Sequence, residues 1–153
     1  AMMLVNVQLF QHEDGARLKL KPFTTELCGH LKKIYDGNGM VNIEIEGDDD
    51  IVLDSDHAIS FGLIITELLT NSFKHAFIEG SDGAGIRIAF SKEGSGSIRF
   101  FYSDNGKGIE PEQMTTSDSM GTSLIRDLTR QLNATLEINN QNGLNFMFLI
   151  PLK

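Results

Sequence analysis

The sequence has a single cysteine, no cluster of basic residues and no long apolar run. Cys28 has no partner for an internal disulfide, and its place on a helical pattern predicts a buried or half-buried thiol rather than a nucleophile. The formal net charge of -8, without clustered Lys or Arg, argues against a nucleic-acid partner, because basic side chains hold phosphate backbones. No apolar run approaches the roughly 20 residues that cross a membrane. These absences predict a soluble, cytoplasmic domain, and they leave open whether a parent protein is anchored in a membrane.

The remaining composition is that of one globular domain. Of the 153 residues, 41% are hydrophobic and 22% are charged, which suits a single ordinary core. The histidines and the cysteine do not have the spacing of a zinc site. The apolar pattern of residues 2–12 indicates the end of a helix that Glu13-Asp14-Gly15 stops. We therefore expect residues 1–14 to be a cloning remnant and the tail of a helix from a longer parent, and residues 15–153 to form the domain.

Hydrophobic periodicity and turn signals predict helices alternating with strand pairs. The first helix is opened by Lys21-Pro22, and its apolar face comprises Phe23, Leu27, His30, Leu31 and Ile34. The predicted helices cover residues 21–36, 57–77 and 121–132, and the predicted strands cover 40–46, 51–53, 86–90, 97–102, 134–138 and 146–150. The strands are expected to form three hairpins, of 40–46 with 51–53, of 86–90 with 97–102 and of 134–138 with 146–150. Asp54 to Asp56 supply N-cap candidates for the central helix. The order favours an α+β fold, a two-layer sandwich with helices on one face of a mostly antiparallel sheet.

Three polar side chains interrupt the apolar pattern of the central helix. At about 100° per residue, Glu67, Asn71 and Lys74 fall on one narrow stripe. A buried polar group without a partner costs roughly 1–3 kcal/mol. The stripe therefore requires either partners within the protein or a ligand.

Two further stretches favour a ligand, although each has an ordinary explanation when taken alone. Asp104-Asn-Gly106-Lys-Gly108-Ile109 follows a predicted strand, where an Asp and glycines also suit a tight turn. Gly121 opens the last helix, as a glycine often does. In the same way, Asn71 could cap a neighbouring loop, Lys74 could extend from a helix end, and Glu67 could pair with Lys74 or with a strand residue.

The order and spacing of these motifs resemble a known family. Glu67-x-x-x-Asn71-x-x-Lys74-His75, then Asp104-x-Gly106-x-Gly108, then Gly121 at a helix start are similar to the N, G1 and G2 boxes of the ATP-binding domain of sensor histidine kinases. This superfamily, with the Bergerat fold, includes gyrase, the heat-shock chaperone of ninety kilodaltons and the mismatch-repair ATPase. The resemblance extends from about residue 17 to 153. Thr70 to Phe77 and Gln131 to Ile138 look most like the second type of histidine kinase core.

The resemblance implies one set of residues around the base of a bound ATP. Asp104 would accept a hydrogen bond from the adenine amino group. Gly106 and Gly108, which precede Ile109, would let the backbone approach the base closely.

A second set would face the phosphates and a magnesium ion. Asn71 would ligate Mg²⁺ through its amide oxygen, while Lys74 and His75 would donate to the phosphates. Glu67 would orient the metal shell or assist the incoming histidine, and in hydrolytic relatives the matching residue activates water. The helix N-terminus at Gly121, Thr122 and Ser123 would face the triphosphate.

Parts of the sequence depart from the family pattern. The G2 stretch reads Ser119-Met120-Gly121-Thr122 where many members have a second glycine, and the polar segment 110–119 has no phenylalanine of the kind some lids carry. The lack of tryptophan excludes the subfamily defined by a Trp-x-Glu motif. None of His12, His30 and His57 is expected to be the phosphoacceptor, which in the family lies on an upstream dimerisation helix.

The resemblance implies the catalytic domain of a two-component sensor histidine kinase, with ATP and Mg²⁺ as cofactors. It would transfer the γ-phosphate to a histidine on the dimerisation helices of its parent chain, a homodimer, and a response-regulator receiver domain would later take the phosphoryl group onto an aspartate. Residues 1–14 would then be the end of the dimerisation helix. The alternatives are an anti-sigma-type serine kinase, a hydrolytic ATPase of the same superfamily and a degenerate nucleotide-binding interaction module.

Overall fold

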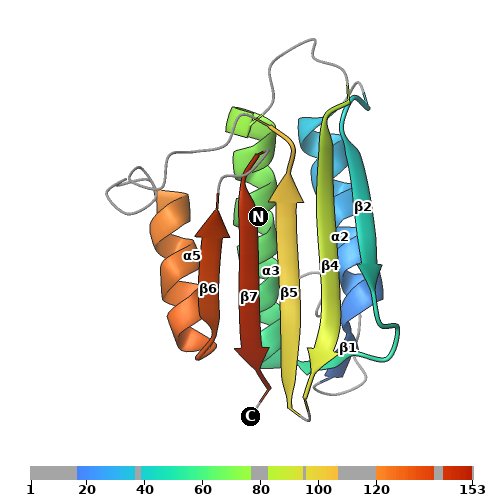
Figure 1. Ribbon diagram of the computed structural model, residues 1–153. Helices are drawn as coiled ribbons and strands as arrows, with labels where there is room; N and C mark the ends of the chain where they lie inside the picture. Colours follow the sequence, from blue (N-terminus) through green and yellow to red (C-terminus); the bar gives the residue numbers. More distant parts are fainter. Residues whose placement is uncertain are drawn as a thin grey trace.

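The computed structural model describes residues 17–36, 39–76, 83–94, 96–106, 120–139 and 143–152. In this part of the chain the helices lie on one face of a five-stranded sheet (Figure 1). The helices are α2 (Leu20–Tyr35), α3 (Ser55–Asn71), its π-helical continuation η1 (Ser72–Ala76) and α5 (Met120–Gln131). The sheet contains β2 (Asn42–Gly47), β4 (Gly85–Glu93), β5 (Ser97–Asp104), β7 (Asn145–Pro151) and β6 (Thr135–Asn139), and a separate pair contains β1 (Arg17–Lys19) and β3 (Val52–Asp54). None of the described helices is long and apolar enough to cross a membrane.

The sheet confirms the predicted α+β class. Its strand order is β2-β4-β5-β7-β6, and all neighbours are antiparallel except β2 and β4, which are parallel. The hairpins predicted at 86–102 and 134–150 are present as β4–β5 and β6–β7. The predicted helix tail at 2–12 and the polar segment 110–119 lie outside the described residues.

The predicted pairing of 40–46 with 51–53 is wrong. β3 pairs instead with β1, and β2 lies parallel to β4. The acidic turn between β2 and β3 is anchored on β4, because Asp48 accepts from the amide of Lys92 at 3.3 Å and Asp50 binds its ammonium group at 2.6 Å. The chain therefore leaves the sheet after this turn, and pairing with β1 allows Leu53 to be buried.

Two members of the predicted apolar face of α2 are exposed. The buried side of the helix comprises Leu20, Phe23, Thr24, Leu27, Cys28 and Leu31. His30 lies about a quarter turn away from this stripe, and Ile34, which is 67% exposed, lies in the last turn beyond Leu31. Periodicity thus identified the helix, but not the point at which it leaves the core.

The central helix begins at its predicted cap. The Asp54 carboxylate accepts from the amide of His57 at 2.8 Å and contacts the ring of that histidine, and these interactions hold the pKa of Asp54 below its usual value. The predicted single helix 57–77 is instead α-helical to Asn71 and π-helical from Ser72. Such π-turns are frequent at functional sites.

Strand β5 determines which side chains reach the helices. Ile98, Phe100, Tyr102 and Asp104 alternate with more exposed residues, and all four are buried. The ring of Phe100 lies 4.7 Å from that of Phe61 on α3, between centroids. Because side chains alternate along a strand, the register that buries Phe100 also places the Asp104 carboxylate on the helix side of the sheet.

Cys28 is a buried thiol, as predicted. It is 2% exposed, and burial raises its pKa to about 12. A thiol with so high a pKa is a poor nucleophile at neutral pH.

Alkaline pH is expected to destabilise the domain through this thiol. Above about pH 9 the unfolded chain releases the Cys28 proton while the folded chain retains it up to about pH 12, so stability falls by about 1.4 kcal/mol per pH unit in that range. Urea unfolding of the wild type and Cys28→Ala at pH 7.5, 9, 10 and 10.5 measures this. The wild type should lose its advantage over the variant as pH rises, and a constant difference would contradict the assignment.

Candidate functional site

The candidate site lies at one end of the sheet and of the helices that cover it. The C-terminal ends of α3 and β5 and the N-terminal end of α5 meet at the same end of the sheet, at the top of Figure 1. Strand β7 starts at this end as well (Figure 1). The topology thus places the described parts of the three motifs, which are separate in the sequence, at one end of the sheet.

Asp104 is the buried acidic group of this end. Asp104 is only 4% exposed, and its carboxylate accepts hydrogen bonds from three donors. The Ser72 hydroxyl donates to Oδ2 at 2.8 Å, while the amides of Gly106 and Leu144 donate to Oδ1 at 3.0 and 3.4 Å. The carboxylate is therefore fixed by the first residue of η1, by its own turn and by the residue that precedes β7.

A tyrosine lies behind the serine. The Tyr102 hydroxyl is 2.7 Å from Ser72 Oγ and 3.1 Å from the carbonyl oxygen of Leu68. Burial raises the pKa of Tyr102 well above its ordinary value, so the phenol keeps its proton. The sequence reasoning missed Ser72 and Tyr102, although Ser72 is adjacent to Asn71 and Tyr102 precedes Asp104 by two on the same strand face.

The strand end that carries Asp104 is held on both sides. Asn105 accepts from the amide of Gly85 at 2.8 Å and donates to the Gly83 carbonyl at 2.7 Å, which ties the end of β5 to the start of β4. On the other side the Asp104 amide donates to Leu144 at 3.0 Å. Gly143 precedes Leu144 and has a φ of 114°, and a Cβ there would overlap the carbonyl oxygen of Asp104. A glycine is therefore required for this close approach.

The polar stripe of α3 is only partly buried. Glu67 and Asn71 are half-buried, and neither side chain has a hydrogen-bond or ion-pair partner among the described residues. No ion pair joins Glu67 to Lys74, which is exposed on η1 with Nζ 6.0 Å from the centre of the Tyr35 ring. The ordinary explanation of Glu67 as half of such a pair is thus wrong, and two oxygen-bearing side chains one turn apart remain available to a ligand.

Several predicted site residues are described only in part. Gly108 and Ile109 lie outside the described residues. The backbone of His75 belongs to η1, and that of Gly121, Thr122 and Ser123 belongs to the first turn of α5, but their side chains are outside the described part. Within that part, no group of three His, Cys, Asp or Glu could hold a metal ion by itself.

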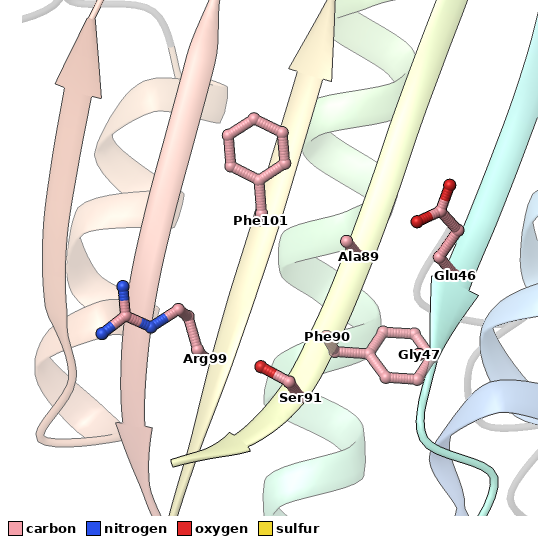
Figure 2. A pocket seen from close by; sticks show the side chains of 7 residues that line it. All are labelled: Glu46, Gly47, Ala89, Phe90, Ser91, Arg99 and Phe101. Atoms are coloured by element: carbon pink, nitrogen blue, oxygen red, sulfur yellow. The ribbon is translucent and has the colours of Figure 1, made fainter.

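A shallow hollow on the other face of the sheet is separate from this end. Figure 2 shows Phe101, Ala89 and Glu46, which line it on the side away from the helices. Arg99 lies there too, with its guanidinium 3.0 Å from the Glu93 carboxylate. The polar residues that line the hollow, Glu46, Ser91 and Arg99, are all exposed. The hollow exists because the small residues Ala89 and Gly47 leave space beside the phenylalanine rings. We therefore place the candidate site at Asp104.

Comparison with known proteins identifies the family of this chain. Residues 56–153 match the family model for histidine kinase-, DNA gyrase B-, and HSP90-like ATPases. The chain belongs to this family, whose domain binds ATP. The expected Bergerat fold is thereby confirmed.

Within the family, the similar proteins are histidine kinases. Blue-light-activated histidine kinase 2 of Erythrobacter litoralis (strain HTCC2594) is 27% identical over 105 residues, which are 67% of this chain and 30% of that protein. The histidine kinase domain of the Erythrobacter litoralis EL346 blue-light activated histidine kinase superposes with a TM-score of 0.81 at 24% identity, over 99% of this chain and 73% of that one. The catalytic domain of histidine kinase ThkA gives a TM-score of 0.72 at 17% identity, over 89% and 95%. The chain thus spans about 30% of the length of the curated relative that it matches.

Proposed function

We propose that this chain is the ATP-binding catalytic domain of a two-component sensor histidine kinase, which transfers the γ-phosphate of Mg-ATP to a histidine outside this sequence. The observation that carries the proposal is the pair of half-buried side chains of Glu67 and Asn71, which have no partner among the described residues and lie at the same end of the sheet as the buried Asp104. An acceptor for a base and oxygen ligands for a metal are the two requirements of a magnesium–nucleotide site. Family membership supplies the ligand, ATP.

Asp104 is the residue that we propose recognises the base. Its carboxylate accepts from the adenine amino group, and its position is fixed by donors from three segments. Gly106, Gly108 and Ile109 continue the chain beside the base. A buried acceptor of this kind discriminates strongly between ligands, because a base without the matching donor leaves it unpaired.

Asn71 and Glu67 are the proposed magnesium side of the site. The Asn71 amide oxygen and the Glu67 carboxylate fit a hard cation that prefers oxygen ligands and takes the rest from phosphate and water. When bound, the ion would neutralise phosphate charge. Lys74 and His75 donate to the phosphates, as do the first-turn amides of α5 at Gly121, Thr122 and Ser123. Catalysis then comes mainly from positioning and charge neutralisation.

The partners follow from this role. We infer that residues 1–14 end a dimerisation helix, that residues 15–153 form the catalytic domain, and that the parent is a homodimer whose helices carry the phosphoacceptor. A response-regulator receiver domain then accepts the phosphoryl group on an aspartate. We place the domain in the cytoplasm, where its ATP is.

Calorimetric titration of a non-hydrolysable ATP analogue, with and without Mg²⁺, tests the proposal. The wild type should bind saturably and more tightly with Mg²⁺. Asp104→Asn should bind about 10- to 100-fold more weakly, since a hydrogen bond to a charged group is worth about 1.5–3 kcal/mol. Asp127→Asn, an exposed site on α5, is the matched control and should bind like the wild type. A folded wild-type domain that does not bind would sink the catalytic role and favour the interaction module.

Turnover separates the kinase from a hydrolytic ATPase. The half-buried carboxylate of Glu67, which no residue in the described part of the chain pairs with, could activate water, so this second function has an observation in its favour. Hydrolysis by the isolated chain that disappears in Glu67→Ala would favour the ATPase. Binding without turnover would favour the kinase, whose acceptor lies elsewhere.

A further inference from the structure

We propose that Ser72 is a positioning residue which, together with Tyr102, fixes Asp104 as a hydrogen-bond acceptor and thereby makes the site selective for a purine that carries a 6-amino group. The inference rests on the proposed function in one respect, namely that Asp104 meets the base of a nucleotide. It adds Ser72, a residue that does not touch the ligand. Ser72 keeps Asp104, which does touch the ligand, a hydrogen-bond acceptor.

The three side chains form one buried chain of hydrogen bonds. Ser72 is 2% exposed, Tyr102 is fully buried and Asp104 is 4% exposed. Ser72 Oγ lies 2.8 Å from Asp104 Oδ2 and 2.7 Å from the Tyr102 hydroxyl. In such an enclosed place every short oxygen–oxygen contact must contain a proton, because two facing lone pairs repel each other.

For an ionised Asp104 carboxylate, one assignment of the protons satisfies the contacts of Ser72. A carboxylate accepts and does not donate, so the single proton of Ser72 points to Asp104. The Ser72 oxygen must then accept from the Tyr102 hydroxyl, which is 2.7 Å away and also lies 3.1 Å from the Leu68 carbonyl oxygen. The direction of donation is therefore Tyr102 to Ser72 to Asp104.

This direction determines which ligand group the site accepts. An ionised carboxylate has about four lone-pair positions. The amides of Gly106 and Leu144 use two of them on Oδ1, and Ser72 uses one on Oδ2. The remaining position on Oδ2 accepts a donor such as an amino group, and it repels a keto oxygen. Ser72 thus holds Oδ2 in a fixed direction and keeps it an acceptor.

The place of Ser72 on the helix explains why it can do this. It continues the buried stripe of Ile65, Leu68 and Leu69 at helical spacing, and it is the polar residue at which that stripe reaches the end of β5. Asn71 precedes it and lies on the half-buried side. Asn71, a proposed magnesium ligand, and Ser72, which orients Asp104, are therefore consecutive residues.

The test is an affinity cycle between the protein hydroxyl and the ligand amino group. Calorimetry compares ADP with purine riboside 5′-diphosphate, which lacks only the 6-amino group, on the wild type and Ser72→Ala. We expect the wild type to prefer ADP by about tenfold or more, and Ser72→Ala to weaken ADP about five- to tenfold while changing the analogue less than twofold. Ser72→Ala should fold, because the Tyr102 hydroxyl retains the Leu68 carbonyl as its acceptor.

Matched variants separate positioning from general damage. Thr66→Val removes another buried hydroxyl from the same helix, one that donates to the Gly62 carbonyl, and should leave both affinities unchanged. Tyr102→Phe removes the first donor of the chain and should reduce the preference for ADP in the same direction, by less. Ser72→Thr keeps the hydroxyl and should keep the preference; it and Tyr102→Phe provide the readout if Ser72→Ala does not fold.

The outcomes distinguish this inference from the proposed function. If the wild type binds ADP and Ser72→Ala weakens both ligands equally, or neither, Ser72 is only structural and the inference is overturned while the ATP site stands. A wild type that does not prefer ADP over the analogue also overturns it. A folded wild type that binds no nucleotide at all overturns the proposed function first.

Discussion

Gly143→Ala is expected to destabilise the domain by roughly 2–5 kcal/mol and to remove measurable nucleotide binding. Gly143 has a φ of 114°, which an alanine adopts only with strain. Its new methyl group would also overlap the Asp104 carbonyl oxygen and lie 2.9 Å from the carbonyl carbon. Because both neighbours are backbone, no side chain can turn away, and β7 must move from the end of β5.

The movement would disrupt the bonds that orient Asp104. The Asp104 amide would lose the Leu144 carbonyl, at 3.0 Å, and the carboxylate would lose the Leu144 amide. We therefore expect the loss of affinity to exceed what the loss of stability alone explains at a temperature where the variant is still folded. Urea unfolding followed by circular dichroism and calorimetric titration measure the two effects.

Gly94→Ala is the matched control for this change. Gly94 also has a positive φ, 63°, but nothing lies within 4 Å of a Cβ there, and it is in the turn between β4 and β5. It should cost about 1 kcal/mol from backbone conformation alone and leave nucleotide binding intact. If the two variants behaved alike, the close approach of Gly143 to Asp104 would not be what makes that glycine necessary.

The sequence predicts the side chains that would contact a ligand better than it predicts the residues that hold those side chains in place. Period-two alternation on 97–102 is a local property, and it also decides that Asp104 faces the helices. The contact between Ser72 and Asp104 joins residues 32 positions apart and depends on strand register and on the position of α3 over the sheet. No local pattern contains those two facts, so the serine next to Asn71 gave no signal of its role.

The two wrong predictions about the fold have the same origin. A hairpin between 40–46 and 51–53 is the natural expectation from adjacency, but contacts from the acidic turn to Lys92 fix the chain elsewhere. Likewise the periodicity of α2 continues to Ile34, whereas burial stops at Leu31 because the core ends there. Local propensity thus determines which elements form, and long-range contacts determine what they pack against.

Phe100→Ala is expected to destabilise the domain by about 3–5 kcal/mol, the usual cost of deleting a fully buried phenylalanine. Phe100 has no exposed surface, and its ring lies 4.7 Å from that of Phe61 and 5.3 Å from that of Phe148. These contacts join α3 to the two central strands. Since a domain is stable by only about 5–15 kcal/mol, the variant should unfold at a much lower urea concentration.

Phe101→Ala provides the comparison, because it deletes the same side chain one position along the same strand. Phe101 is half-buried on the face away from the helices, opposite Ala89 and Met147 on the neighbouring strands. With part of its ring already in water, its loss should cost about 1 kcal/mol, on the order of one cross-strand pair. The chain has no tryptophan, so circular dichroism is the suitable probe of unfolding. Equal costs at the two positions would mean that β5 does not present Phe100 to the helices, and then Asp104, on the same face, could not be the buried acceptor on which the nucleotide site depends.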